Sequence, residues 1–304
     1  SPIAATPYIA AMGEGGEPWV NGASMNNQGV EFTVSFKSDP SSEFQWAVSA
    51  NIGTYKTELT DLPSNVINKY AGDGVHDLIL GRSPNSAYGL VADGIFKTQE
   101  EVDAHADQPG KAVGRIRYKD LDGDGVINET YDRTWIGCYD PDFFGGLNFD
   151  FAYKGFDLNL FFEGMFGNDV NSDWKKESDI WLFTNPAWKN HATRMLGGWS
   201  PDNPNSDIPA ISNNTANQEQ RFSSWFIEDG SYIKLRNIEL GYTFPTKLIK
   251  KMHMSNLRLY AAAYNVFTLK KFWGDDKYTS FDPERPSYHY LTPFTFNFGI
   301  NVSF

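Results

Sequence analysis

The sequence predicts an all-β chain whose strands are those of a transmembrane antiparallel β-barrel. The clearest observation is the segment Phe294–Phe304, in which every even position is apolar and every odd position is small or polar. This strict period of two covers 11 residues, the length that a tilted strand needs to cross a bilayer. A soluble β-sandwich can end on such a strand, but an uninterrupted apolar face of this size is unusual in one.

The same alternation recurs upstream of this segment. The alternating segments are 30–36, 44–52, 147–153, 156–162, 232–244 and 257–267. The links Asp39–Ser42 and Lys154–Gly155 are short enough to close hairpins between their neighbours. Within 232–244 the parity of the apolar positions changes, and a β-bulge near Arg236 and Asn237 reconciles the two halves. With Phe294–Phe304 these make seven alternating segments, and we expect about eight strands of membrane length in all.

The connections between these strands alternate in length. The short connections are Asp39–Ser42, Lys154–Gly155 and Pro245–Asn256, and the long ones are Thr54–Asp142, Gly167–Gly230 and Leu269–Thr292. Short turns on one side and long loops on the other are typical of outer-membrane barrels, in which the long loops face outward. In the first long loop, Thr98 and Glu101 form a capping box that predicts a short helix over Glu100–Ala106.

The composition argues against several other classes of protein. No segment approaches the roughly 20 apolar residues of a transmembrane helix, and the mean hydropathy is −0.46. The formal net charge of −12, without a basic stripe to neutralise phosphates, argues against nucleic acid as a partner. Cys138 is the single cysteine, so no internal disulfide can form. Aromatic residues make up 15% of the chain, which suits strands and membrane interfaces.

One local motif has the pattern of a cation-binding loop. Asp120, Asp122 and Asp124 stand at its first, third and fifth positions, followed by a glycine that permits a sharp turn. Carboxylate oxygens with this spacing converge on a hard cation, and the carbonyl of Val126 would supply the seventh-position ligand. We therefore predict a calcium site with Asp132 as a further ligand, although position 12 is a tyrosine and Asp132 follows it. The alternative is an Asp/Gly turn whose charges are solvated.

Catalytic patterns are missing, whereas tryptophans accumulate in one long loop. The chain has no HExxH spacing, no Gly-x-Ser-x-Gly elbow and no phosphate-binding glycine loop, so we predict no enzymatic activity and no catalytic residues. Four tryptophans are candidate substrate- or partner-binding residues, because aromatic faces stack on sugars and anchor protein interfaces. They are Trp174, Trp181, Trp188 and Trp199. The alternative is that they pack the loop's own core or form an interfacial girdle.

Several short stretches together match one family. They are Asn27–Glu31, Tyr88–Phe96, Ile116–Val126, Asp132–Gly137, Tyr153–Asp157, Phe226–Asn237 and Phe294–Phe304. In these stretches the chain resembles the SusC-like TonB-dependent transporters, which are outer-membrane proteins of Bacteroidetes that import glycans and sometimes peptides. The Asp-rich loop departs from this pattern, because related loops usually carry an Asp at position 12.

The resemblance implies that residues 1–304 form the C-terminal portion of a barrel of ~22 strands. A plug domain and the TonB-coupling segment are then expected upstream of Ser1. The implied partners are a SusD-like lipoprotein lid, TonB, the rest of the barrel and plug, outer-membrane lipid, and a glycan or peptide substrate, with a glycan favoured. The resemblance also implies that Phe304 is a signal for barrel assembly.

A soluble secreted all-β carbohydrate-binding or hydrolytic module is the alternative interpretation. It accounts for the aromatic residues and the acidity. It does not account for strands of membrane length, for the alternation of short and long connections, or for the terminal Phe304.

Overall fold

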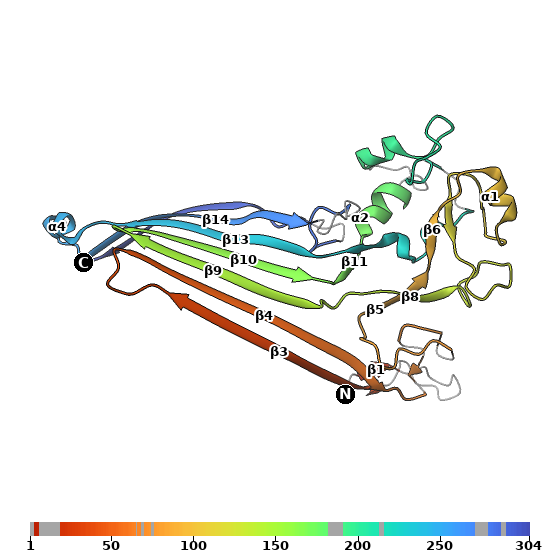
Figure 1. Cartoon of the computed structure of the whole chain (residues 1–304), viewed down its shortest axis with the longest axis horizontal. Coiled ribbons are helices and arrows are strands. Elements are labelled where there is room, and N and C mark those ends of the chain that lie inside the picture. The colour runs from red at the N-terminus through yellow and green to blue at the C-terminus, as the bar shows by residue number, and fades with distance from the viewer. Residues whose placement is uncertain are drawn as a thin grey trace.

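The computed structural model describes residues 3–5, 19–64, 66–67, 70–73, 76–181, 191–212, 216–270, 279–286 and 290–304. The molecule is elongated, with a sheet of long strands at one end and short elements packed together at the other (Figure 1). We call the long sheet the wall, and we call the short elements within residues 62–142 and 167–231 the outer-loop layer.

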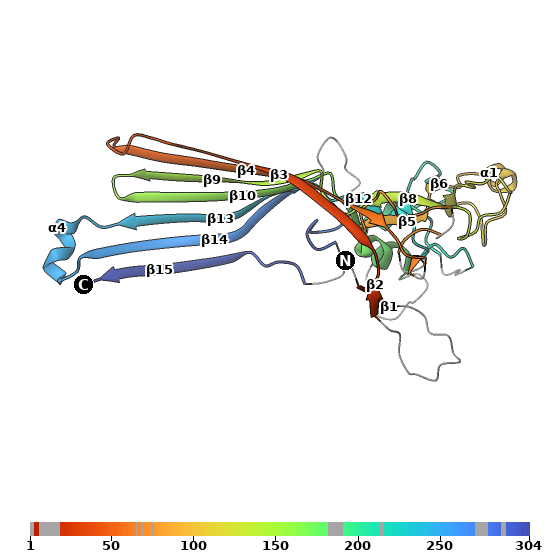
Figure 2. The ribbon, with the colours of Figure 1, turned by 90° about the horizontal axis from the view of Figure 1, so that it is seen from below.

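The wall is a seven-stranded antiparallel sheet in which each strand lies beside its neighbour in sequence (Figure 2). Its strands range from 9 to 18 residues, which is enough to cross a bilayer. They are β3 (Ser24–Lys37), β4 (Phe44–Asp61), β9 (Phe143–Tyr153), β10 (Phe156–Phe166), β13 (Tyr232–Thr243), β14 (Asn256–Lys270) and β15 (Thr295–Ser303). The predicted up-and-down antiparallel arrangement is confirmed, and the described part of the chain contains seven long strands rather than eight.

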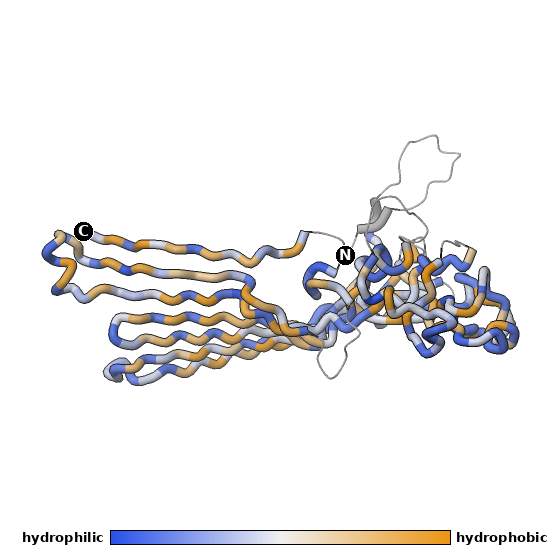
Figure 3. Tube along the Cα trace, turned by 90° about the horizontal axis from the view of Figure 1, so that it is seen from above, coloured by the Kyte–Doolittle hydropathy of each residue, from blue (hydrophilic) through white to orange (hydrophobic). Residues whose placement is uncertain are grey.

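The strand register places the apolar positions of all seven strands on one face of the wall. In one row, Phe298 pairs with Ala261, which pairs with Leu240. The row continues through Leu158 and Phe151. Many of these side chains are exposed, as for Phe298 at 82%, and an extensive exposed apolar face is suited to contact with lipid. Figure 3 shows the resulting alternation of hydrophobic and hydrophilic residues along the strands. We call this face the lipid face and the opposite one the lumen face.

Two predicted irregularities of the wall are confirmed. Lys154 and Gly155 both have positive φ, at 48° and 87°, which is the backbone of a tight two-residue hairpin turn between β9 and β10. In β13 the pairing register shifts between Leu235 and Asn237, so Arg236 is the extra residue of a β-bulge. The bulge keeps the apolar side chains before and after it on the lipid face.

The connection from Pro245 to Asn256 differs from the compact turn that we expected. It contains the short helix α4 (Thr246–Ile249), followed by the single 3-10 turn η6 (Lys250–Met252). Ile249 is buried there, and a left-handed residue, His253, ends the turn before β14 begins. No helix in the described part of the chain is long and apolar enough to cross a membrane.

The outer-loop layer is built from short pairs of strands and single helical turns. Its paired strands are β5 (Ser86–Leu90) with β8 (Arg133–Cys138), β6 (Ala92–Ile95) with β7 (Ile116–Tyr118), and β11 (Asp169–Asn171) with β12 (Ile227–Asp229). Its helical elements are α1 (Gln99–Ala104), α2 (Asp173–Lys175), η3 (Lys176–Trp181), η4 (Thr193–Gly197) and η5 (Ser224–Phe226). A further short pair, β1 (Ile3–Ala5) with β2 (Trp19–Asn21), precedes the wall.

The capping box predicted for the loop helix is present in part, because Thr98 caps the helix but Glu101 bonds to the residue before Thr98. The side chain of Thr98 accepts a hydrogen bond from the Glu101 backbone N–H, and the Glu101 carboxylate accepts one from the Lys97 N–H. The helix runs from Gln99 to Ala104, so it begins one residue earlier and ends two residues earlier than predicted.

The first long loop also begins later than predicted, because β4 extends to Asp61 instead of ending near Thr54. The last residues of β4 pair only with β3, because the pairing of β4 with β9 ends at Gly53. Leu59, near the end of this extension, is fully buried in a small cluster with Ala23 and Ile79. The β3–β4 hairpin therefore projects beyond the rest of the wall and joins the outer-loop layer.

Candidate binding surfaces at the outer mouth

The outer-loop layer has a hydrophobic core of its own. Seven buried residues from both long loops form it: Leu90, Ile95, Ile116, Tyr118, Ile127, Ile180 and Phe226. A buried ion pair joins the two loops beside this core, with Arg115 Nη1 2.9 Å from Glu219 Oε2. Glu219 also accepts a hydrogen bond from the Ile116 backbone N–H at 2.8 Å. Burial raises the pKa of Glu219, and the charge of Arg115 opposes this shift.

The two candidate tryptophans whose side chains the structure describes, Trp174 and Trp199, occupy different environments. Trp199 packs against the core of the outer-loop layer and is partly buried. Trp174, in α2, stacks edge-on against Phe281 with ring centroids 4.7 Å apart. It lines a cavity of about 440 Å³ that is otherwise formed largely by Phe281, Pro286, Tyr290 and Leu291. The Trp181 side chain and the whole of Trp188 lie outside the described residues.

The structure therefore gives Trp199 and Trp174 different roles. Trp199 has the environment expected of a loop-core residue, which is the alternative that the sequence left open. Trp174 has the environment expected of a residue that contacts a ligand or partner, since it lines an aromatic cavity.

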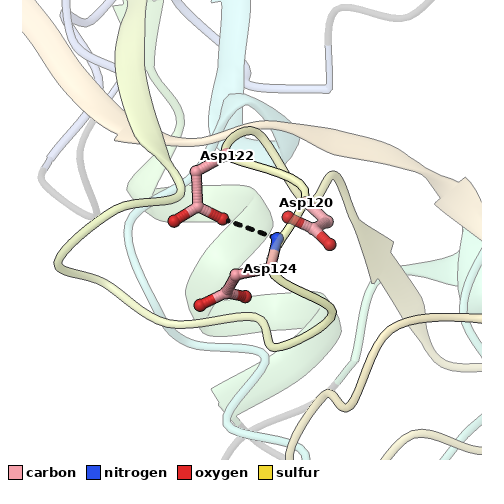
Figure 4. Close-up of side chains that lie close together, drawn as sticks. All are labelled: Asp120, Asp122 and Asp124. Atoms are coloured by element: carbon pink, nitrogen blue, oxygen red, sulfur yellow. Dashed lines mark hydrogen bonds between the residues drawn. The ribbon is translucent and has the colours of Figure 1, made fainter.

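The acidic motif forms a tight loop whose carboxylates converge. Oxygens of Asp120, Asp122 and Asp124 all lie within 4.8 Å of one another, and Figure 4 shows the three side chains grouped around the turn. Asp120 accepts hydrogen bonds from the Gly123 N–H at 2.7 Å and from the Gly125 N–H at 2.9 Å. Both glycines have positive φ, at 75° and 85°, which is why glycine suits these positions.

Asp132 and Ile127 hold this loop against the rest of the layer. Asp132 is fully buried, and its two carboxylate oxygens accept from the backbone N–H groups of Leu121 and Asn128 at 2.8 and 2.7 Å. The structure thus gives Asp132 a position at the base of the loop, whereas the three converging carboxylates are exposed or half-buried. Ile127 is 2% exposed and belongs to the hydrophobic core of the outer-loop layer.

The lumen face of the wall carries polar networks for which the sequence assigned no role. An amide ladder crosses three strands: Asn237 donates to Asn159 at 3.0 Å, and Asn159 donates to Asn148 at 3.0 Å. Nearer the periplasmic turns, Arg258 bridges Asp157 and Glu239. Alternation alone predicts that these residues lie on the lumen face. Which of them contact one another depends on the register between strands that lie far apart in sequence.

At the outer end of the lumen face, the wall binds the connection between β14 and β15. The Lys234 side chain is 2% exposed and pairs with Asp282 at 3.2 Å and with Glu284. Arg236 pairs with Glu163 at 2.8 Å and also contacts Glu284. The bulge contributes to this arrangement, because the extra residue allows Arg236 to lie on the same face as its neighbours Lys234 and Asn237. The segment 279–286 is therefore anchored to the inside of the barrel mouth.

Comparison with curated sequences gives long matches to one group of receptors. TonB-dependent receptor P3 of Formosa agariphila is 30% identical over 302 residues, which cover 93% of this chain and 29% of the relative. TonB-dependent receptor SusC of Bacteroides thetaiotaomicron is 26% identical over 297 residues, covering 93% of this chain and 27% of the relative. The chain thus spans less than a third of the length of these relatives. No protein-family model matches the chain.

Among solved structures, the RagAB peptide transporter superposes on this chain with a TM-score of 0.71. The identity is 22%, and the match covers 99% of this chain and 31% of the other. A second match is the RagAB peptide importer in its 'closed-closed' state, with the same TM-score and identity. The predicted resemblance and outer-membrane location are confirmed: the chain resembles SusC-like TonB-dependent receptors over 93% of its length, and it has the fold of the C-terminal portion of a transmembrane β-barrel of this kind.

Proposed function

We propose that this chain supplies the C-terminal wall and outer loops of a TonB-dependent importer of nutrients. One observation carries the proposal: an amphipathic sheet of membrane-length strands continues at one end into a folded layer that surrounds polar and aromatic cavities. Such a layer is positioned to bind a nutrient before it enters the lumen. The chain positions and gates the nutrient, and it makes or breaks no covalent bond. The plug, the TonB-coupling segment and the remaining strands belong to the proposal as parts outside residues 1–304.

A SusD-like surface lipoprotein is the proposed partner of the outer-loop layer. The match to SusC and the superposition on RagAB support this proposal. The name of SusC gives no substrate, whereas RagAB is named as a peptide transporter, so a glycan and a peptide both stay as proposed substrates. Trp174, Trp181, Trp188 and Trp199 stay the proposed contacts, with Trp174 the best supported because it lines a cavity.

The test uses cells in which the gene for the full-length transporter is deleted or restored. Uptake of labelled oligosaccharides and labelled oligopeptides is measured in both strains and in a strain without TonB. We expect one substrate class to depend on the transporter and on TonB together, and a surface lipoprotein to co-purify with the transporter. Equal uptake of every substrate in all three strains, with no lipoprotein recovered, would contradict the proposal.

We also propose that the acidic loop binds calcium through Asp120, Asp122, Asp124 and the Val126 carbonyl, with Asp132 at the base of the loop. The donor set fits the ion, because calcium takes carboxylate and carbonyl oxygens and the three carboxylates already converge. Without a cation these charges repel one another. We expect Asp122→Ala and a calcium chelator each to speed proteolysis within residues 107–133, with Asp103→Ala in α1 as the control. Identical cleavage with and without calcium would contradict the site.

A further inference from the structure

A second cavity, of about 560 Å³, lies where the wall meets the outer-loop layer. Separate segments of the chain converge on it, among them β11, α2, the first residue of β13 and the anchored segment 279–286. In Figure 1, β11 and α2 lie at this junction. Tyr232 and Met165 line the cavity from the lumen face, since they pair with each other and alternate with residues of the lipid face. The cavity therefore opens at the outer mouth of the barrel.

Two of the three acidic side chains that line this cavity have no cationic partner among the residues that the structure describes. Asp169, Asp173 and Glu284 line the cavity, and none of the described residues that line it is a lysine or an arginine. Glu284 is neutralised by Lys234 and Arg236, as described above. Asp169 and Asp173 form no ion pair with any of the residues that the structure describes, although Asp169 accepts a hydrogen bond from the Cys138 N–H at 2.8 Å. Burial raises the pKa of Asp169, and the nearby carboxylates of Asp229 and Asp142 add to this shift.

The cavity also holds hydrogen-bond acceptors that lack donors. Asn168 is 6% exposed, and its side-chain carbonyl oxygen has no hydrogen-bond partner among the described residues. The side-chain oxygen of Asn171 is likewise buried and unpartnered. Buried acceptors without donors destabilise a folded protein. A ligand that brings N–H donors would satisfy these oxygens.

We propose that this cavity binds the positively charged amino or guanidinium group of a peptide substrate. This inference rests on the proposed import function and names the substrate class for it. A cation with several N–H donors satisfies the asparagine oxygens and balances Asp169 and Asp173 together. A neutral sugar hydroxyl satisfies the oxygens but leaves both charges unbalanced. The volume of the cavity suits an amino-acid side chain better than a bare metal ion.

The experiment measures binding to the purified full-length transporter, without energised import. The probes are two hexapeptides with blocked ends that differ at one position, which is lysine in one and norleucine in the other. We expect the lysine peptide to bind at least tenfold more tightly at low salt. We expect that preference to fall below threefold in Asp173→Asn and in Asp169→Asn/Asp173→Asn. Asp103→Asn, on the exposed side of the layer, is the matched control and keeps the preference.

Two variants are needed because Asp169 also supports the Cys138 backbone, so the double variant can lose local structure for that reason alone. Asp173→Asn avoids this difficulty, because the only side-chain hydrogen bond of Asp173 to a described residue is a long one from Asn171 at 3.4 Å. Equal affinity for the two peptides, or a preference that survives Asp173→Asn, overturns the inference. Binding of a neutral oligosaccharide that is lost in Asp173→Asn, without a preference for lysine, also overturns it. Since binding is measured apart from uptake, these outcomes leave the import proposal standing.

Discussion

The wall and the outer-loop layer are stabilised in opposite ways by one chain. In the wall, backbone pairing joins each strand to its neighbours, and the large apolar side chains remain exposed on the lipid face, as for Ile300 at 65%. In the outer-loop layer the strands are only three to six residues long, and buried side chains such as Tyr118 and Phe226 hold them together. The wall therefore depends on a membrane to cover its apolar face, whereas the outer-loop layer has a buried hydrophobic core like that of a soluble protein. Substitutions that affect one region and spare the other test this distinction.

The largest expected effect comes from removing the last strand of the wall. Deletion of Thr295–Ser303 from the full-length transporter leaves β14 without a partner over the nine residue pairs that it makes with β15. An unpaired edge inside a bilayer is costly because no water is present to satisfy the backbone. We expect more than a tenfold loss of protein from the outer membrane, measured by immunoblot of membrane fractions.

Phe304→Ala tests the proposed assembly signal separately from strand pairing. We expect a smaller but clear reduction in abundance and in heat-modifiable mobility, whereas Ser303→Ala should match the parent. Parental abundance of Phe304→Ala would remove the assembly role while leaving the strand intact.

The next effect belongs to the outer-loop layer. Phe226→Ala removes a side chain that is 1% exposed, and a truncation of this kind costs about 3–5 kcal/mol. We expect rapid proteolysis within the loops while the wall keeps its heat-modifiable mobility. Phe222→Ala, at a residue that is 36% exposed, is the control and should alter cleavage little. Loss of the wall together with the loops would show that the two regions are not separate units.

Substitutions at two adjacent residues of β4 test the two faces of the wall. Val48 lies on the lipid face, paired with Phe149, and Ser49 lies on the lumen face, paired with Asn148. We expect Val48→Lys to destabilise the barrel by about 2–4 kcal/mol, as for a lysine at the middle of the bilayer, and Ser49→Lys to cost less than half of this. Urea unfolding in lipid vesicles measures both. Equal losses of stability in the two variants would contradict the assignment of Val48 to the lipid face and Ser49 to the lumen face.

The smallest expected effects are those of substituting two tryptophans of one loop, Trp199 and Trp174, which we expect to differ in kind. Trp199→Ala opens the edge of the loop core and should cost about 1–3 kcal/mol of local stability, seen as faster loop proteolysis. Trp174→Ala should leave proteolysis unchanged and weaken capture of the lipoprotein or the nutrient, because Trp174 lines a cavity. The opposite pattern would exchange their roles.

The sequence predicts the wall well because its signal is local. Alternation with a period of two fixes which residues face lipid, and the change of parity around Arg236 predicts the bulge without any tertiary information. The predicted end of β4 was wrong by several residues, since the strand continues through Thr54–Asp61, which pair with β3 beyond the alternating segment. The short helix α4 was missed because four residues carry no helical period.

The binding surfaces could be predicted only in part. The acidic loop is visible because its ligands are close together in sequence, and their convergence follows from the turn itself. The cavity at Asp169 and Asp173 depends on residues as far apart as Tyr139 and Pro286, which no spacing rule brings together. Trp199 could not be distinguished from Trp174 because burial depends on the neighbouring loop rather than on either residue's own segment.

The projecting part of the β3–β4 hairpin has a mechanical consequence. Beyond the last pairing with β9, the eight residues Thr54–Asp61 span about 26 Å at the usual rise of a strand, and Leu59 near their tip is locked into a buried cluster. A two-stranded ribbon of this length transmits bending and torsion much better than an irregular loop does. A pull on the outer surface would therefore reach the barrel rim as a tilt of β3 and β4. The projecting part of the hairpin would act as a lever, and its pivot would lie near Gly53, where the pairing of β4 with β9 ends.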